Sequence, residues 1–345
     1  MGITNREYFL LFLGSYLLVG LLTPFMRKIA LATDVVDKPN TPHKSHKQPV
    51  PYLGGVAIII GIIVVAYSTS LVSNFTSKTF WLATSVLAPA LVLGLIGLWD
   101  DMKNLPPLPR FLAQTIAGVF TAFILIATDN VGNPTGSEIF DTVITIIWVV
   151  GICNSINFFD NIDGGAAGTV AISSTSLAVL ALNGDQYLIA ALSTVTAGAT
   201  LGFLIWNKSP ARIYMGDAGA LFLGVLLATL TIRLHPESDT QLGSYFTPIF
   251  LLAIPILDTS VAVVSRLKRN VSPFQGGQDH LSHRLIRAGL SRRKAAVTLW
   301  ALSGIYSLIS ILISRPNLNL ENAIVLFSGA VWVILFGLFI RTKDA

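Results

Sequence analysis

Acidic and amide side chains gather at three points in the sequence where long apolar segments begin or end. At the first point two adjacent acids, Asp100 and Asp101, directly follow Trp99. Two carboxylates at the C-terminal end of a helix repel each other and face the negative end of its dipole, so a metal ion or a cationic partner would offset the cost. The other interpretation is a pair of solvated loop acids. Lys103 and Arg110 follow closely and could contact anions.

At the second point amides and acids recur at intervals of three residues. Asn154, Asn157 and Asp160 therefore approach one face of a helix, and Asp163 follows in a glycine-containing turn. Polar groups so close together cannot face lipid, and their oxygen atoms suit a hard cation or a ribose and base edge. One of the two acids could simply cap the next helix, but a cap does not explain the whole set.

At the third point Asp217 stands at the start of an apolar segment and is followed by Ala218 and Gly219. A helix N-terminus binds phosphate through its free backbone N–H groups, and the two small residues leave room for a ligand. Asp217 is equally consistent with an ordinary helix cap.

Asp258 differs from these acids because it lies inside an apolar segment, between Pro255 and Arg266. An intramembrane carboxylate is a functional candidate by default. The alternative is a buried ion pair that orients two helices, with Arg266 as the expected partner.

Cationic side chains are concentrated in two further segments. If residues 280–287 are helical, one face combines four of them at i, i+3, i+4 and i+7: His280, His283, Arg284 and Arg287. Such a face beside a membrane suits a diphosphate. A histidine pair could instead bind zinc, but the oxygen-rich side chains elsewhere favour magnesium.

The break between apolar segments at residues 26–52 is basic and rich in proline. Its cations, among them Lys47, would attract a polyanion, and the prolines stiffen the loop. Gly54 and Gly55, which follow, would let the backbone approach another segment closely. Contact with anionic lipid headgroups explains the basic loop equally well.

The elements that must position these residues are membrane-spanning helices. The chain of 345 residues is 53% hydrophobic and 12% charged, whereas a soluble domain is about 25% charged. Its net charge of +5 does not indicate nucleic-acid binding, because the basic residues lie between apolar segments. The single cysteine, Cys153, rules out a disulfide framework. We expect a polytopic integral membrane protein whose first apolar segment is retained.

A membrane span needs roughly 20 mostly apolar residues, and eleven segments qualify. We therefore expect an all-α fold with about 11 transmembrane helices and one transmembrane catalytic domain over residues 1–345. The expected spans are Tyr8–Phe25, Leu53–Val72, Phe80–Trp99, Phe111–Thr128, Thr142–Phe158, Gly168–Leu182, Tyr187–Trp206, Ala218–Leu234, Tyr245–Val264, Ala295–Ser314 and Asn322–Ile340.

Lysine and arginine predict the orientation of these spans. With the N-terminus outside, the inner segments hold 19 Lys and Arg residues and the outer segments hold 4. Because cytoplasmic loops carry the excess of such residues, we expect the N-terminus outside and the C-terminus in the cytoplasm. The polar clusters then all face the cytoplasm.

Five motifs in order resemble those of the polyprenyl-phosphate N-acetylhexosamine-1-phosphate transferases, the family that contains WecA, TagO and MraY. They cover residues 34–291 and are Asp37-Lys38-Pro39-Asn40, Asp100-Asp101, Asn154-x-x-Asn157-x-x-Asp160-x-x-Asp163-Gly164, Met215-Gly216-Asp217-Ala218-Gly219 and Asp279-His280-Leu281-Ser282-His283-Arg284-Leu285. The last motif looks more like the WecA and TagO branch. The chain departs from the usual pattern at Asn161 for Gly, Ala220 for Ser and Ser282 for a third His.

The resemblance implies an enzyme of the bacterial cell membrane that acts in cell-envelope polysaccharide synthesis. It would transfer N-acetylhexosamine 1-phosphate, most simply GlcNAc-1-phosphate, from a UDP-sugar to undecaprenyl or another polyprenyl phosphate and release UMP. Its cofactor would be Mg²⁺, with Mn²⁺ as a substitute. The partners are the UDP-sugar, the lipid and the membrane, without nucleic acid, and a homodimer is left open. A transporter or lipid flippase is the alternative, although such sites usually lie near the bilayer midplane.

The resemblance also implies a role for each candidate residue. Asp217 and Asn157 would hold the metal. Asp100 would orient or deprotonate the lipid phosphate, and Asp101 would support the metal site. The nucleotide-binding set is Asn154, Asp160 and Asp163. The phosphate- and sugar-binding set is Lys47, Arg110, His280, His283 and Arg284.

Overall fold

The chain folds into a bundle of helices with one small antiparallel ladder. This computed structural model describes residues 4–37, 49–72, 76–103, 106–127, 137–273 and 277–342. The elements are α1 (Asn5–Ala32), β1 (Val36–Asp37), β2 (Val50–Pro51), α2 (Gly54–Val72), α3 (Ser77–Lys103), α4 (Pro107–Ala127), α5 (Glu138–Phe159), α6 (Gly165–Asn183), α7 (Tyr187–Asn207), α8 (Gly216–Ile232), α9 (Gln241–Leu251), α10 (Ala253–Lys268), α11 (Leu281–Arg287), α12 (Arg292–Ile313) and α13 (Glu321–Arg341). The predicted all-α fold holds apart from the two short strands.

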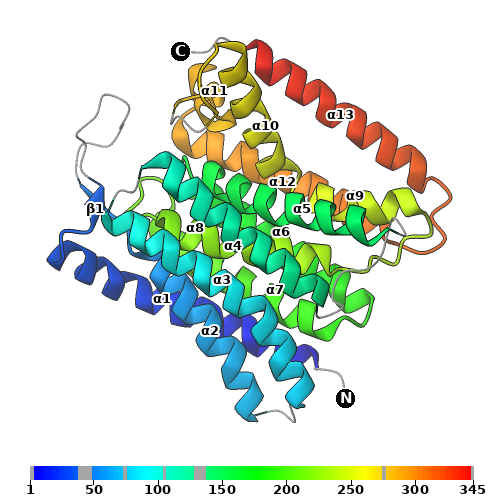
Figure 1. Cartoon of the computed structure of the whole chain (residues 1–345), viewed down its shortest axis with the longest axis horizontal. Coiled ribbons are helices and arrows are strands. Elements are labelled where there is room, and N and C mark those ends of the chain that lie inside the picture. Colours follow the sequence, from blue (N-terminus) through cyan, green and yellow to red (C-terminus); the bar gives the residue numbers. More distant parts are fainter. Residues whose placement is uncertain are drawn as a thin grey trace.

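Helix α8 lies at the centre of the bundle, packed against α2, α3 and α5 (Figure 1). Fifteen of its 17 residues are buried, as expected of a helix that is apolar on all sides. Small residues bring its neighbours close. A Cβ on Gly97 of α3 would lie 2.4 Å from the carbonyl oxygen of Asp217, and one on Gly224 would lie 2.8 Å from Cα of Cys153. The start of α8 is therefore fixed by direct backbone contact.

The apolar helices are those of a multi-pass membrane protein. Seven described helices are long and apolar enough to cross a membrane, the bent pair α9 and α10 passes the same test when taken together, and α2, α4 and α8 are shorter apolar helices. Each of the eleven predicted segments coincides with one of these helices or with the bent pair. The number of spans that cross the membrane and their orientation stay predictions.

The predicted continuous span Tyr245–Val264 is wrong in shape, because the chain breaks between α9 and α10 and bends by 72°. Pro255 has no N–H to donate to the carbonyl of Leu251, so the helical ladder cannot continue there. The hydroxyl of Ser173 on α6 donates to that carbonyl oxygen at 2.7 Å instead. The polar backbone at the break is thus satisfied inside the protein, as a membrane requires.

The ladder of β1 and β2, which the sequence did not predict, joins the first loop to the start of α8. Its register pairs Val36 with Pro51. The end of β2 also pairs with the segment before α8, where the backbone N–H of Tyr214 donates to the carbonyl of Pro51 at 2.7 Å. Gly55 approaches α8 so closely that a Cβ there would lie 2.2 Å from the nitrogen of Gly219. This is the close backbone approach that the glycine pair predicted.

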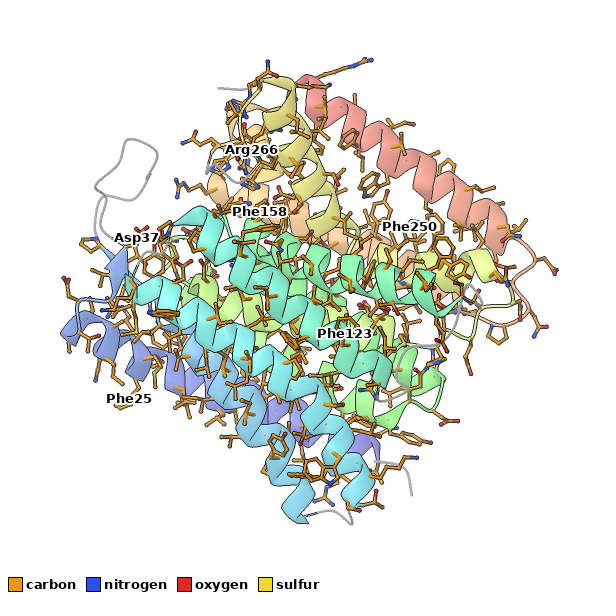
Figure 2. All side chains as sticks on the ribbon, in the orientation of Figure 1. Phe25, Asp37, Phe123, Phe158, Phe250 and Arg266 are labelled. Atoms are coloured by element: carbon orange, nitrogen blue, oxygen red, sulfur yellow. The ribbon has the colours of Figure 1, made fainter. Side chains whose placement is uncertain are left out.

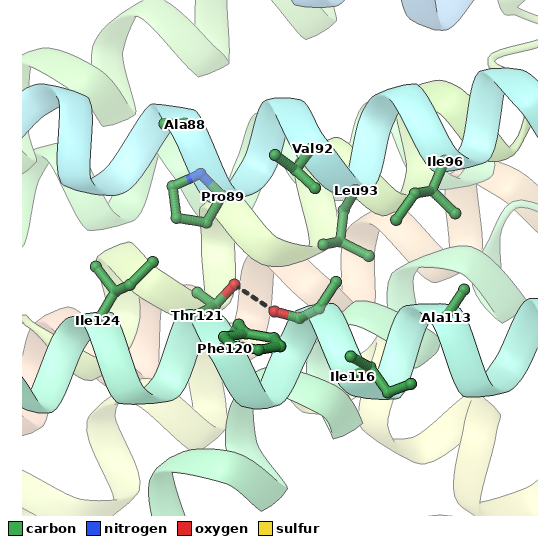
Figure 3. A pocket seen from close by; sticks show the side chains of 11 residues that line it. Ala88, Pro89, Val92, Leu93, Ile96, Ala113, Ile116, Phe120, Thr121 and Ile124 are labelled. Carbon is green, nitrogen blue, oxygen red and sulfur yellow. Dashed lines mark hydrogen bonds between the residues drawn. The ribbon is translucent and has the colours of Figure 1, made fainter.

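An apolar groove lies between α3 and α4 (Figure 3). Its volume is about 470 Å³, and apolar side chains from the two helices line it. The hydroxyl of Thr121 donates to the carbonyl of Ala117 at 2.8 Å. Val92 and Phe120 at its edges are 51% and 65% exposed, so the groove opens toward lipid and offers no polar group to a soluble substrate.

Candidate active site

The N-terminus of α8 is the point at which the predicted acidic and amide residues converge. Asp101, in the last turn of α3, accepts hydrogen bonds from the backbone N–H groups of Asp217 at 2.9 Å and Ala218 at 3.0 Å. A carboxylate from another helix thus caps α8, where it stabilises the positive end of the helix dipole. Gly216 has a φ of 70°, a backbone conformation that favours glycine, and a Cβ there would lie 2.5 Å from Asp101 Oδ2.

Asp100 and Asp101 do not begin a loop, as the sequence suggested, because α3 continues to Lys103. Asp100 is 4% exposed and Asp101 is half-buried. The interpretation as solvated loop acids therefore does not hold. Asp101 acts first as the cap of α8, and this gives a physical reason for its support of the neighbouring site.

The two predicted metal ligands touch. Asn157, near the end of α5, donates through Nδ2 to Asp217 Oδ1 at 2.7 Å. Rotating the amide by half a turn would present its oxygen at the same place. Asp217 is half-buried at the start of α8, so its carboxylate is open on one side. The pair combines a carboxylate and an amide, which are ligands that Mg²⁺ accepts.

The turn after α5 carries Asp160 and Asp163 toward the same region. Asp163 Oδ2 accepts from the backbone N–H of Ala211 at 3.1 Å. Gly164 has a φ of 73° and donates its N–H to Asn207 Oδ1 at 3.0 Å. Asn207, 1% exposed, also donates to the carbonyl of Ile213 at 2.9 Å. One buried amide thus joins the acidic turn to the segment that leads into α8.

The acids make the region strongly negative. Burial, followed by the charges of Asp217 and Asp163, raises the pKa of Asp160 to about 7. Burial also raises the pKa of Tyr52, as do the charges of Asp37, Asp101 and Asp217 and a hydrogen bond to Asp37. Burial and the charges of Asp163, Asp37 and Asp160 raise the pKa of Tyr214, although Arg292 opposes them. Like charges held together in this way favour a bound cation.

A divalent ion bound in this region would be coordinated by both the protein and the substrate rather than by protein groups alone. No three His, Cys, Asp or Glu side chains within the described ranges converge on a common point at metal-binding distance. Mg²⁺ commonly takes only one or two protein carboxylates and fills the remaining positions with water and substrate phosphate. Asp217 and Asn157 supply such a partial set.

A second cluster of ionisable groups lies on α10 and α11. Asp258 is fully buried and accepts from His280 Nδ1 at 2.7 Å and from the backbone N–H of Leu281 at 2.7 Å. Its carboxylate therefore caps α11. The suggested pairing of Asp258 with Arg266 is wrong, because Asp258 pairs with His280 instead.

Arg266 instead pairs with Asp279, from Nε to Oδ2 at 3.0 Å, and stacks on the ring of Phe158 at 5.7 Å (Figure 2). Arg269 also pairs with Asp279. Burial favours the neutral acid, but the hydrogen bond from Arg266 and the charges of Arg269 and Arg266 outweigh it, so the pKa of Asp279 lies below its usual value. Arg266 Nη2 lies 3.3 Å from His280 Nε2.

Arg284 has a structural role in place of the predicted phosphate contact. The side chain is 1% exposed. Its Nε donates to the carbonyl of Asp279 at 2.9 Å, Nη1 to those of Phe339 and Thr342 at 2.8 and 2.7 Å, and Nη2 to the hydroxyl of Ser265 at 2.6 Å. The guanidinium thus ties α11 to the end of α13 and to α10, and little of it remains for a ligand.

His283 is the predicted phosphate-binding residue that keeps a ring nitrogen for a substrate. The predicted helix forms as α11, and the rings of His280 and His283 are 5.9 Å apart. His283 Nδ1 is buried without a hydrogen-bond partner among the described residues. Burial, the charges of His280, Arg287 and Arg292, and an opposing effect of Asp258 leave its pKa at about 4. His283 is therefore neutral at pH 7 and would bind as a hydrogen-bonding group.

Three predicted residues stand apart from this geometry. Asn154 donates to the carbonyl of Val150 at 2.8 Å, within its own helix. Lys47 lies outside the described residues, and for Arg110 only the backbone, in α4, is described. Their assigned roles stay predictions.

Sequence reasoning missed Asn207, Tyr52, Tyr214 and Arg292. Asn207 lies near the end of an apolar segment, and an amide in such a place is a usable signal. The two tyrosines have no comparable signal, because their rings meet only through the pairing of the first loop with the α8 approach, 6.1 Å between centroids.

Several known proteins are similar in sequence to this chain over most of its length. Residues 83–235 match the model of a family described as glycosyl transferase family 4. A Bacillus subtilis protein named "probable undecaprenyl-phosphate N-acetylglucosaminyl 1-phosphate transferase" is 33% identical over 334 residues, 95% of this chain and 87% of that protein. A Mycolicibacterium smegmatis protein named "decaprenyl-phosphate N-acetylglucosaminephosphotransferase" is 32% identical, over 88% of this chain and 81% of that protein.

A third relative broadens the comparison. A Bacillus subtilis protein named "phospho-N-acetylmuramoyl-pentapeptide-transferase" is 31% identical over 320 residues, 88% of this chain and 95% of that protein. At 33% identity over 95% of this chain, the first relative alone is similar enough to show a shared family. The chain therefore belongs to glycosyl transferase family 4, the family of the polyprenyl-phosphate N-acetylhexosamine-1-phosphate transferases.

Proposed function

We propose that the chain transfers N-acetylglucosamine 1-phosphate from UDP-N-acetylglucosamine to a polyprenyl phosphate and releases UMP, as a membrane step of cell-envelope polysaccharide synthesis. The observation that carries the proposal is the contact between Asn157 and Asp217 at the start of α8, next to the acids of α3 and the turn after α5. The names of the Bacillus subtilis and Mycolicibacterium smegmatis relatives that mention N-acetylglucosamine support the sugar and the lipid class. The transporter alternative has no support from them.

Bound Mg²⁺ would be held by Asp217 and Asn157 and would neutralise charge on the donor's diphosphate. The protein's own groups then divide the remaining work. Asp101 fixes the first turn of α8, whose position sets the Asp217 carboxylate. Asp160 and Asp163 face the nucleoside, and His283 donates to phosphate or sugar.

Asp100 orients the acceptor phosphate rather than activating it. A phosphate monoester has a second pKa near 6, so the acceptor is mostly dianionic at pH 7 and hardly needs a base. The buried position of Asp100 at the end of α3 suits an orienting contact mediated by a cation. A homodimer is compatible with this arrangement but is not required by it.

We place the site on the cytoplasmic side, with eleven spans and the N-terminus outside. The support is the excess of 19 Lys and Arg residues over 4 on the sides so defined. Single cysteines beside Asp100, Asn157, Asp217 and His283 should resist an impermeant thiol reagent in intact cells and react in inverted vesicles. Labelling of these positions from outside would overturn the topology.

The decisive experiment measures UMP release by the purified protein in detergent. Undecaprenyl phosphate is supplied as acceptor with UDP-GlcNAc, UDP-GalNAc or UDP-N-acetylmuramoyl-pentapeptide as donor. The expected result is UMP release with UDP-GlcNAc that depends on the lipid. Release with the pentapeptide donor alone would reassign the donor, and no release with any donor from a well-folded sample would refute the transferase.

A further inference from the structure

A single amide, that of Asn161, connects three segments around the candidate site. Its Nδ2 donates to the carbonyl of Phe158 at 2.8 Å and lies 3.4 Å from Asp258 Oδ2. Its Oδ1 accepts from the hydroxyl of Ser282. The contact to Phe158 is local, whereas the contacts to Asp258 and Ser282 join the turn after α5 to α10 and α11. Asn161 is thus the hydrogen-bonded link between the acidic turn and the second cluster.

The partners of Asn161 are themselves held firmly. Asp258 is fully buried and receives His280 and the N–H of Leu281. Ser282 is 1% exposed, in the first turn of α11. The link therefore acts between rigid groups, and losing it would free one of the few contacts between α11 and the turn that carries Asp160 and Asp163.

His283 follows Ser282 directly and is the group whose position this link controls. Helix α11 has only 7 residues, so a shift at its first turn moves His283 with it. The Nδ1 atom of His283 is buried without a hydrogen-bond partner among the described residues, so no hydrogen bond at that atom fixes the ring.

We propose that Asn161 and Ser282 form a latch that sets the distance between His283 and the Asp160–Asp163 turn, and so position the donor's phosphate or sugar. This inference rests on the proposed function, because it assigns the latch to the donor site of that reaction. Neither residue touches the reacting atoms, and both act through His283. The latch therefore affects donor binding more than the chemical step.

The latch predicts a change in KM with little change in kcat. Asn161→Ala and Ser282→Ala should each raise the KM for UDP-GlcNAc about 5-fold, because each removes the hydrogen bond between these two side chains, and Asn161→Ala also removes the contacts to Phe158 and Asp258. Both changes remove the same contact, so the double variant should resemble the single ones. Ser282→Thr keeps the hydroxyl and should restore the wild-type KM.

A second series separates positioning from a general loss of stability. In a His283→Ala background, Asn161→Ala should cause no further rise in KM, since the group it positions is absent. Ser310→Ala is the matched control. Its hydroxyl donates between helices to the carbonyl of Thr247 at 3.2 Å, far along the chain from the site, and its loss should leave KM unchanged.

The outcomes are distinguishable. A wild-type protein that releases no UMP from any donor overturns the proposed function. An active wild type whose Asn161 and Ser282 variants melt earlier but keep the wild-type KM overturns the latch alone. Independent, multiplying effects of Asn161→Ala and His283→Ala also overturn it, because they would show that Asn161 does not act through His283.

Discussion

Two groups of ionisable residues sit at the same end of the bundle, and they are built in opposite ways. The acidic cluster, Asp100, Asp101, Asp160, Asp163 and Asp217, gathers like charges, and burial followed by the charges of Asp217 and Asp163 raises the pKa of Asp160. The paired cluster, Asp258, Arg266, Asp279, His280 and Arg284, alternates charges and hydrogen bonds, so the pKa of Asp279 is lowered. Phe158 of α5 lies between them, in contact with Arg266 and His280.

This difference indicates which of the two clusters is suited to bind a ligand. Ionised groups that are buried with good partners fix a structure, and breaking such a set is costly. Groups of one sign held together are destabilising unless something else neutralises them, and such strained arrangements concentrate at functional sites. We therefore propose the acidic cluster as the reaction centre and the paired cluster as its scaffold.

Removal of divalent metal should have the largest effect, because it leaves the acidic cluster without its counter-charge. EDTA treatment followed by dialysis should reduce UMP release to background, and added Mg²⁺ or Mn²⁺ should restore it. The melting temperature, which depends on the paired cluster, should change little. Full activity after metal removal would mean that protein cations alone neutralise the acids.

Asp217→Asn comes next and compares the two clusters directly with Asp258→Asn. Losing the charge of a metal ligand removes transition-state stabilisation of about 4 kcal/mol, roughly a thousand-fold in turnover. Asp258→Asn places an amide N–H against His280 or Leu281 and should mainly lower the melting temperature and the yield. Turnover per folded molecule, checked by size exclusion, is the measurement. Near-normal turnover in Asp217→Asn with none in Asp258→Asn would show that the paired cluster, and not the acidic cluster, holds the reaction centre.

Arg284→Ala tests the scaffold. It removes the buried hydrogen bonds from the guanidinium to the carbonyls of Phe339 and Thr342, so we expect a loss of about 3 kcal/mol in stability. Arg287→Ala is the control, because Arg287 is exposed and donates only to the carbonyl of Gln278 among the contacts found. Thermal unfolding in detergent measures both. If Arg284→Ala melts like the wild type but loses donor affinity, Arg284 is the phosphate ligand that its sequence position suggested.

The smallest effect concerns pH. Burial holds the pKa of His283 at about 4, below its ordinary value near 6.5, so the ring stays neutral from pH 5.5 upward. The pH dependence of KM between 5.5 and 8 should therefore have the same shape in the wild type and in His283→Gln. An acidic limb near pH 6.5 that disappears in His283→Gln would show that His283 binds as a cation.

Sequence could predict the elements and the acidic cluster because both depend on local patterns. Apolar length revealed the helices, and the three-residue spacing of Asn157 and Asp160 revealed their shared face. The sequence alone could not predict the paired cluster, because Asp258, Arg266 and Arg284 look equally like ligands until their partners are seen. The 72° bend was missed for a similar reason, since a proline within an apolar segment either kinks or breaks a helix according to what satisfies the freed carbonyl.

The family resemblance located the motifs but did not explain two departures from them. Asn161 and Ser282 stand where relatives usually carry Gly and His, and in the structure these two residues contact each other. Only the folded chain reveals this, because 121 positions separate them in the sequence.

The short central helix has a consequence for how water and lipid reach the reaction. At 1.5 Å per residue the 17 residues of α8 span about 26 Å, less than the roughly 30 Å of bilayer hydrocarbon. A helix of this length falls short of the bilayer surface at one end or at both. If its first turn lies on the proposed cytoplasmic side, that turn would sit below the headgroup plane, where a lipid phosphate would reach it sideways and a water-soluble nucleotide would descend to it.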